Sequence, residues 1–372
     1  MENRDTHQLS IIITEKCNLN CSYCYCDKNS TNTVKFETAC KRIDDFLFNK
    51  SKDSNIIHIL FIGGEPFCEF ELLQNIVNYT ILKYPLLNIH FKVVTNGTLV
   101  HGKIQDWLIT NQKHFSVELS LDGEKDSQNK SRGNTYNSID ISFFKDKLKH
   151  SVVNKVISPS NIESLAKDVI FMENQGFRIK AVIADGVNWS EGNNPEILSQ
   201  QLKQLINHYI RNKNQQPFNL LCHALYCINN PDITISKCEA GSKSYAIDTK
   251  GNIHSCHRCS EYYNNGAWKI PNNKINLQIV PLLNDACKHC CANIICNSCP
   301  ASVASKIDNH TACKMSCLLS KVLFYANAYF YIQLLMNCPD HIYFRGRNKE
   351  QIHSTYKGAR HIIENLNPEQ AF

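Results

Sequence analysis

The sequence predicts an α/β fold in which a parallel sheet curls towards a barrel and a smaller Cys-rich part follows. Two observations predict this class. Short runs rich in Ile, Val and Phe alternate with amphipathic stretches over the first two-thirds of the chain. Near residue 215 this periodicity fades, and 13 of the 19 cysteines lie beyond that point. We expect the second part to have too few apolar runs for a conventional core and to be held together by metal.

The apolar runs of the first part predict six strands, at Gln8–Thr14, Ile56–Ile62, Ile89–Thr95, Phe115–Leu121, His150–Ile157 and Arg178–Ala184. Helical periodicity predicts the intervening and following helices, at Glu37–Phe48, Glu71–Tyr84, Lys103–Asn111, Ser138–Lys149, Ile162–Gln175 and Pro195–Asn214. The loops after the strand C-termini are then the expected positions of an active site. The stretch Leu318–Cys338 is apolar but interrupted by polar residues, which predicts a buried C-terminal helix rather than a membrane span.

Composition excludes several classes of protein. With 43% hydrophobic residues, 14 Gly and 11 Pro among 372 residues, the chain is neither disordered nor fibrous. The net charge of +6 is spread without a long basic block, so we expect no nucleic-acid partner. The start of the chain lacks the apolar segment of a secretory signal, which predicts a cytoplasmic protein. In a reducing compartment, regularly spaced cysteines bind metal or act in catalysis more often than they form disulfides.

Three cysteines follow the first predicted strand in a C-x3-C-x2-C pattern, at Cys17, Cys21 and Cys24. Three thiolates leave one iron of a four-iron cluster open for a substrate or cofactor. Taken alone, the pattern also fits a partial zinc knuckle.

Polar motifs recur at the ends of the next strands. The second strand ends in Gly63-Gly64-Glu65-Pro66, where paired glycines let the backbone approach a ligand closely. The third ends in Thr95-Asn96-Gly97-Thr98. The fourth ends in Ser120-Leu121-Asp122-Gly123, and Arg132 follows it.

Together these motifs resemble those of radical S-adenosylmethionine (radical SAM) enzymes, over about residues 8 to 190. The resemblance implies a partial (β/α)6 TIM-like barrel and a [4Fe–4S] cluster on the three cysteines, whose fourth iron binds S-adenosylmethionine. It further implies that Gly63, Gly64 and Glu65 line the amino group of this cofactor, that Ser120 and Arg132 lie on its carboxylate and ribose side, and that Asn161 reaches it. The implied chemistry is reductive cleavage to methionine and a 5′-deoxyadenosyl radical that abstracts a substrate hydrogen.

The Cys-rich part resembles the SPASM extension of such enzymes, which carries two auxiliary four-iron clusters. Its first element, Cys238 to Cys256, contains Gly251 and reads as a β-hairpin that turns at Asp248 to Gly251. The resemblance implies one cluster on Cys238, Cys256 and Cys299, with an open iron or a fourth thiolate from Cys222 or Cys227. The other cluster would use Cys287, Cys290, Cys296 and Cys317, with Cys317 favoured over Cys313. Only two residues separate Cys296 and Cys299 where the family usually has three, which puts the role of Cys299 in question.

The predicted domains are a radical SAM partial barrel at 1–215, a SPASM domain at 216–338 and a C-terminal tail with a helix at 339–372. The resemblance, with the run Cys256-His257-Arg258, implies a peptide maturase that forms a thioether or carbon–carbon crosslink in a ribosomally made precursor peptide. The alternative is an anaerobic sulfatase-maturating enzyme, which forms formylglycine. A zinc-stapled binding module or an electron carrier is a remote third reading.

The implied partners are the precursor peptide and a flavodoxin- or ferredoxin-type reductant, with no membrane. Because the first cluster motif already begins at Cys17, we also expect either a separate leader-recognition protein or direct recognition of the precursor by the barrel. No substrate-side base can be named from the sequence.

Overall fold

The computed structural model describes residues 6–50, 55–148, 151–230, 238–263, 287, 289–296, 299 and 310–366. These residues divide into two compact units. The first comprises the described residues of 1–154, 175–177 and 239–279, and the second those of 155–174, 178–238 and 280–372. The domain boundaries predicted at 215 and 338 stay predictions.

A parallel sheet forms the centre of the first unit. Its strands are β1 (Thr6–Thr14), β2 (Ile56–Gly63), β3 (Ile89–Thr95), β4 (Phe115–Ser120), β5 (Val152–Ile157), β7 (Ser244–Ile247) and β8 (Ile253–His254). They follow the order β5-β4-β3-β2-β1-β7-β8, and all neighbours are parallel except the last pair. The first five strands begin or end within two residues of their predicted positions, because runs rich in Ile, Val and Phe favour buried strands.

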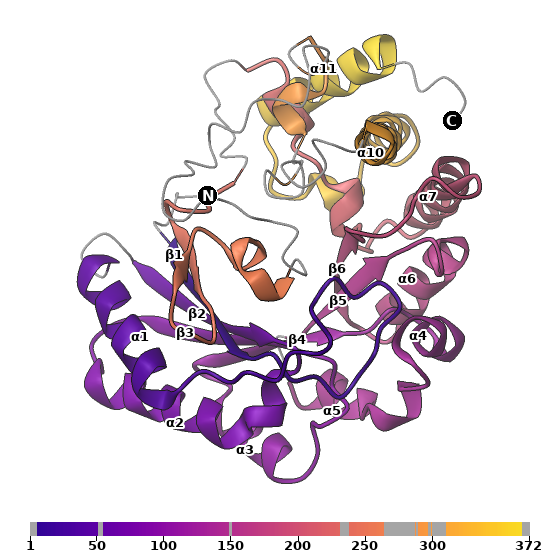
Figure 1. The fold of residues 1–372 in the computed structure, drawn as a ribbon. Helices are drawn as coiled ribbons and strands as arrows, with labels where there is room; N and C mark the ends of the chain where they lie inside the picture. Colours follow the sequence, from indigo (N-terminus) through magenta and orange to yellow (C-terminus); the bar gives the residue numbers. More distant parts are fainter. Residues whose placement is uncertain are drawn as a thin grey trace. The chain divides into compact units, whose positions relative to one another are not determined.

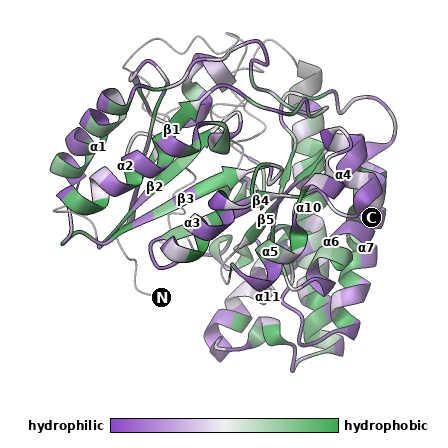
Figure 2. Ribbon diagram, turned by 90° about the horizontal axis from the view of Figure 1, so that it is seen from below, coloured by the Kyte–Doolittle hydropathy of each residue, from purple (hydrophilic) through white to green (hydrophobic). Residues whose placement is uncertain are grey.

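One face of this sheet is strongly apolar and carries the helices. Phe61, Phe91 and Phe115 stack across β2, β3 and β4 with ring centroids 6.2–6.4 Å apart. Trp107 packs edge-on against Phe115 at 4.9 Å, and Phe70 packs against Trp107. Figure 1 shows the helices along this side of the sheet, and Figure 2 shows hydrophobic residues concentrated in the strands. The helices of the first unit are α1 (Phe36–Lys50), α2 (Phe70–Lys83), α3 (Lys103–Asn111), α4 (Lys125–Arg132) and α5 (Ile141–Asp146).

The hairpin of the Cys-rich part has the predicted turn. Gly251 N–H donates to Asp248 O at 3.0 Å, and Gly251 adopts φ +83°, which favours glycine. β7 also pairs in parallel with β1, so the hairpin extends the sheet of the predicted barrel (Figure 1). The sequence did not predict this pairing, because nothing in a four-residue strand indicates which strand it will join.

The second unit contains the rest of β5, β6 (Arg178–Ile183) and four long helices. Beside β6, Ala184 N–H donates to Ile157 O at 2.7 Å. The helices are α6 (Leu165–Asn174), α7 (Asn194–Arg211), α10 (His310–Asn337) and α11 (Lys349–Asn365). α10 packs against both α7 and α11. Its Asn327 is buried and donates to Leu220 O at 2.5 Å, so this polar interruption of the apolar helix has a partner.

Three helix predictions need correction. α4 was not predicted, because its sequence is polar throughout and shows no apolar stripe. The helix expected at Ser138–Lys149 is shortened to α5, which Asp140 caps by accepting from Phe143 N–H at 3.1 Å. α10 begins at His310, well before the expected Leu318, so Cys317 lies inside the helix.

No helix in the described part of the chain combines the length and hydropathy of a bilayer-spanning segment. The predicted cytoplasmic location stays a prediction.

Candidate functional site

The three cysteines of the first motif lie in the loop between β1 and α1, at the C-terminal end of the sheet. Cys17 and Cys24 are exposed, and Cys21 is partly buried. Asn18 ties this loop to the end of β3, since it donates to Thr98 Oγ1 at 2.8 Å and accepts from Asn96 Nδ2 at 2.9 Å. The loop is therefore anchored by side chains of the Thr-Asn-Gly-Thr motif.

Gly63 and Gly64 let the end of β2 approach the residues that lead into this loop. A Cβ atom on Gly63 would lie 2.0 Å from Thr14 O, and one on Gly64 would lie 2.1 Å from Lys16 O. At this approach Gly64 N–H donates to Thr14 O at 2.9 Å. The sequence predicted close approach to a ligand, whereas the group that approaches here is the backbone just before Cys17.

Glu65 is fully buried beside these glycines. Its Oε1 accepts from Thr95 Oγ1 at 2.8 Å and from Phe67 N–H at 3.1 Å, and its Oε2 accepts from Asn96 N–H at 2.7 Å. Burial raises the pKa of Glu65 to about 7, although these three donors favour the ionised form. A carboxylate has about four acceptor positions, so Glu65 retains capacity for one more donor, such as an amino group.

This raised pKa predicts a pH-dependent component of stability. The ordinary pKa of the group is 4.5, so between about pH 4.5 and 7 the unfolded chain releases a proton that the native protein keeps. The free energy of unfolding of the ligand-free protein should therefore fall by roughly 3 kcal/mol over this range and then level off. Urea unfolding of the wild type and of Glu65→Gln at several pH values measures this change in the free energy of unfolding. Equal pH profiles for the two proteins would contradict the prediction.

Tyr23, Asp122 and Arg132 form a buried network at the end of β4. Arg132 Nε donates to Asp122 Oδ2 at 3.0 Å, and Tyr23 Oη donates to the same carboxylate. The Arg132 guanidinium also lies over the Tyr23 ring, 5.3 Å from its centroid. Next to Tyr23, Ser22 N–H donates to Ser131 O at 2.9 Å. The predicted site residue Arg132 thus positions the cysteine loop from α4, and Ser120 lies buried on β4 two residues before Asp122.

Breaking this network should be costly. Asp122 is 0% exposed and Arg132 is 6% exposed, so Asp122→Asn leaves a buried guanidinium without its counter-charge. We expect a loss of about 3 kcal/mol in the free energy of unfolding, measured by urea titration. Glu364→Gln removes a carboxylate from the exposed Arg360–Glu364 pair and should cost less than about 1 kcal/mol. Equal losses in the two variants would contradict a buried structural role for Asp122.

Two tyrosines that follow the hairpin also hold the cysteine loop, and no sequence motif pointed to them. Tyr262 O accepts from Asp27 N–H at 2.9 Å, and Tyr262 Oη donates to Glu15 O at 3.2 Å. The rings of Tyr263 and Tyr25 pack at a tilt of 40°, with centroids 5.6 Å apart. Both tyrosines pack on Ile12 and Ile62 of the sheet. From sequence alone, an adjacent Tyr-Tyr pair would be interpreted as part of the hydrophobic core. Only its position in the fold indicates that it holds the cysteine loop.

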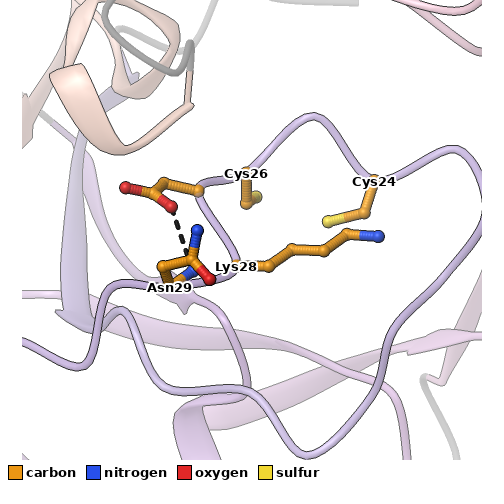
Figure 3. A pocket seen from close by; sticks show the side chains of 5 residues that line it. Cys24, Cys26, Lys28 and Asn29 are labelled. Atoms are coloured by element: carbon orange, nitrogen blue, oxygen red, sulfur yellow. Dashed lines mark hydrogen bonds between the residues drawn. The ribbon is translucent and has the colours of Figure 1, made fainter.

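The cysteine loop borders a cavity of about 380 Å³, which is lined by Cys24, Cys26, Asp27, Lys28 and Asn29 (Figure 3). Lys28 Nζ donates to Cys21 O at 3.1 Å. The neighbouring Cys26 lowers the pKa of Cys24 most, and the positive charges of Lys28 and Arg132 lower it further. Cations beside thiols favour the thiolate form, which is the form that binds metal.

The residues present fit an iron–sulfur cluster. The loss of hydration around the sulfur, together with the nearby Glu65, Cys21 and Cys24, raises the pKa of Cys17 to about 11, so the three thiols lie within electrostatic reach of one another. In the described ranges no three His, Cys, Asp or Glu side chains converge on a single metal ion. A four-iron cluster needs thiolates on separate irons rather than convergence on one point.

Comparison with known sequences identifies this part of the chain. The radical SAM superfamily matches residues 11–140. Residues 11–140 are a radical SAM domain. An uncharacterized protein of Methanocaldococcus jannaschii is 37% identical over 115 residues, which is 31% of this chain and 38% of that protein. The radical SAM cyclopropyl synthase TigE of Paramaledivibacter caminithermalis is 22% identical over 289 residues, which is 69% of this chain and 58% of that protein. The chain therefore spans less than two-thirds of either curated relative.

Solved structures confirm the predicted fold class. The structure of anSMEcpe with bound AdoMet has a TM-score of 0.70 at 18% identity and covers 91% of this chain and 100% of that chain. SuiB of Streptococcus suis bound to S-adenosylmethionine has a TM-score of 0.56 at 16% identity. This match covers 78% of this chain and 72% of the SuiB chain. The parallel sheet with its helices is therefore an α/β partial barrel, which is the fold that the motifs implied.

Asn161, which the resemblance implied as a contact of the cofactor, lies outside the matched residues 11–140. Asn161 belongs to the second unit, where its Oδ1 accepts from Ser158 N–H at 2.9 Å and its Nδ2 donates to Val156 O at 2.9 Å. These bonds shape the turn after β5. Its contact with a cofactor stays a prediction.

The cysteines of the first predicted auxiliary cluster are divided between the units. Cys256 lies in the first unit, with its Sγ 3.7 Å from Cys259 Sγ, while Cys238 and Cys299 belong to the second. Cys222 and Cys227 are also in the second unit, and burial raises the pKa of both thiols. This ligand set stays a prediction.

The second predicted set lies within one unit. Burial raises the pKa of Cys317, and Cys290, Cys296 and Cys287 raise it further, so all four predicted ligands lie within electrostatic reach. The side chain of Cys313 falls outside the described residues. None of the 18 cysteines whose side chains are described forms a disulfide.

Proposed function

We propose that this chain is a radical SAM peptide maturase. One observation carries the proposal: Cys17, Cys21 and Cys24 are held at the C-terminal ends of β1 to β4, with the buried Glu65 beside them. This arrangement combines three thiolate ligands with a carboxylate that can accept from an amino group.

In this proposal the three cysteines hold a [4Fe–4S] cluster, and Glu65 with Gly63 and Gly64 lines the amino group of S-adenosylmethionine. When bound there, these cofactors supply a 5′-deoxyadenosyl radical that abstracts a substrate hydrogen. Tyr23, Asp122 and Arg132 keep the cysteine loop in place, while Ser120 and Asn161 would contact the rest of the cofactor.

A peptide is the proposed substrate. Support comes from what similar proteins have been solved with: anSMEcpe with a Cp18Cys peptide and SuiB with the precursor peptide SuiA. The name of TigE, a cyclopropyl synthase, supports formation of a new bond rather than oxidation alone. We therefore favour a thioether or carbon–carbon crosslink in a precursor peptide, with a flavodoxin- or ferredoxin-type reductant.

Two auxiliary [4Fe–4S] clusters complete the proposal. One would use Cys287, Cys290, Cys296 and Cys317, supported by their electrostatic proximity. The other would use Cys238, Cys256 and Cys299 from a SPASM domain at 216–338. Anaerobically reconstituted protein should then hold about twelve iron atoms per chain. About four iron atoms with one or two zinc ions would contradict the auxiliary clusters.

Activity is tested with reduced enzyme and candidate peptides. We expect release of 5′-deoxyadenosine and a peptide that loses about two hydrogens in mass, without an aldehyde. An aldehyde trapped by hydrazine would instead indicate formylglycine formation. If fully loaded enzyme releases no 5′-deoxyadenosine from intact cofactor, the proposed function is wrong.

A further inference from the structure

Ser120 of β4 and Asn154 of β5 lie next to each other on the face of the sheet opposite the helices of the first unit. Phe115 packs against Trp107 of α3, so the alternation of side chains along β4 directs Ser120 to the other face. Ser120 and Asn154 are partners in the parallel register of β4 and β5, which puts both side chains on this face (Figure 1). Ser120 is buried and is a proposed cofactor contact, so Asn154 borders the candidate site.

The side chain of Asn154 contains a buried acceptor without a donor. Asn154 Oδ1 is shielded from solvent, and it has no hydrogen-bond partner among the residues that the structure describes. Leaving such a group unpaired costs free energy, and folded proteins therefore contain few of them. An unpaired acceptor at a candidate ligand site calls for a donor on the ligand, because binding pockets fix their ligands through a few placed polar groups.

Asn161, which the resemblance implied as a cofactor contact, differs in this respect. Its Oδ1 accepts from Ser158 N–H and its Nδ2 donates to Val156 O, each at 2.9 Å. Both ends of this amide therefore have partners within the turn after β5. Of the two asparagines, Asn154 is the one whose amide oxygen lacks a donor in the described part of the chain.

We propose that Asn154 is a binding residue whose Oδ1 accepts a hydrogen bond from a hydroxyl or an amide N–H of the ligand bound beside Ser120. This inference rests on the proposed function, because that function puts both a cofactor and a peptide at this site. A ribose hydroxyl of S-adenosylmethionine and a backbone N–H of the peptide are the two sources of such a donor.

The test compares variants of the anaerobically reconstituted full chain. Asn154→Leu has a similar volume but no acceptor, whereas Asn154→Asp keeps an oxygen at the position of Oδ1. Asn365→Leu is the control, because Asn365 is exposed on α11 and its Nδ2 donates to His361 O at 2.9 Å. All three variants should keep the iron content of the wild type, since neither asparagine is a proposed cluster ligand.

Equilibrium dialysis with S-adenosylmethionine identifies the source of the donor. If a ribose hydroxyl supplies it, Asn154→Leu should raise the dissociation constant of the cofactor roughly tenfold, while Asn154→Asp and Asn365→Leu stay close to the wild type. If a peptide N–H supplies it, the dissociation constant of the cofactor is unchanged. In that case Asn154→Leu should raise the KM of the peptide that the wild type modifies roughly tenfold, with kcat unchanged.

The remaining outcomes overturn the inference. If Asn154→Leu binds both the cofactor and the peptide as the wild type does, water is the partner of Oδ1. Equal losses in Asn154→Leu and Asn154→Asp, together with a loss of iron, indicate a structural role. If Asn154→Leu does not fold, Asn154→Ala is measured in its place by the same criteria. A wild-type protein that holds its clusters but binds no S-adenosylmethionine contradicts the proposed function instead.

Discussion

Cys21→Ala is expected to lose about four iron atoms per chain and to release 5′-deoxyadenosine only at the background rate. The reason is that two remaining thiolates cannot hold a cluster that needs ligands on three of its irons. Iron and sulfide analysis of the anaerobic protein, with quantification of 5′-deoxyadenosine by chromatography, measures both effects.

Cys40→Ala is the matched control for this prediction. Cys40 is a buried thiol of α1, 5% exposed, and is not a proposed ligand. The variant should keep the iron content and the activity of the wild type, since the thiol there packs as a small hydrophobic group. If Cys21→Ala retained full iron while Cys40→Ala lost it, the assignment of the first cluster would be wrong.

Gly64→Ala should destabilise the protein by about 4 kcal/mol or more and abolish cluster binding. The added Cβ would lie 2.1 Å from Lys16 O and 2.8 Å from Glu15 O, both of them backbone atoms that cannot turn away as a side chain can. Relief of this clash must move the chain that leads directly to Cys17. Urea unfolding and iron content after reconstitution measure the two effects.

Gly176→Ala separates this clash from the general cost of replacing glycine. Gly176 adopts φ +86°, and a Cβ atom there would meet nothing within 4 Å. Its cost is therefore limited to the backbone conformation, about 1–2 kcal/mol, and its iron content should equal that of the wild type. A loss at Gly64 no larger than the loss at Gly176 would show that the close approach to Lys16 is unimportant.

The strands of the barrel could be predicted because each is specified by a local sequence pattern. Each of the first five strands is a short run of β-branched and aromatic residues, and the burial pattern of β3 alternates as such a run requires. α4 escaped prediction because its stability comes from side chains such as Gln128, which accepts from Asp122 N–H, rather than from an apolar stripe. The parallel pairing of β7 with β1 joins segments more than two hundred residues apart, and periodicity contains no information on such partners.

The sequence by itself determined the chemistry of the candidate site. Three cysteines within eight residues can be brought together by a single loop, so their spacing alone predicts a shared metal group, and Glu65 follows its glycines directly. Only the tertiary structure decided what holds these groups. Asp122 reaches Tyr23 across 99 residues, and Tyr262 reaches Glu15 across 247. Such contacts depend on which strand ends meet at the edge of the sheet, because buried polar groups take whatever partner the packing of the whole chain brings to them.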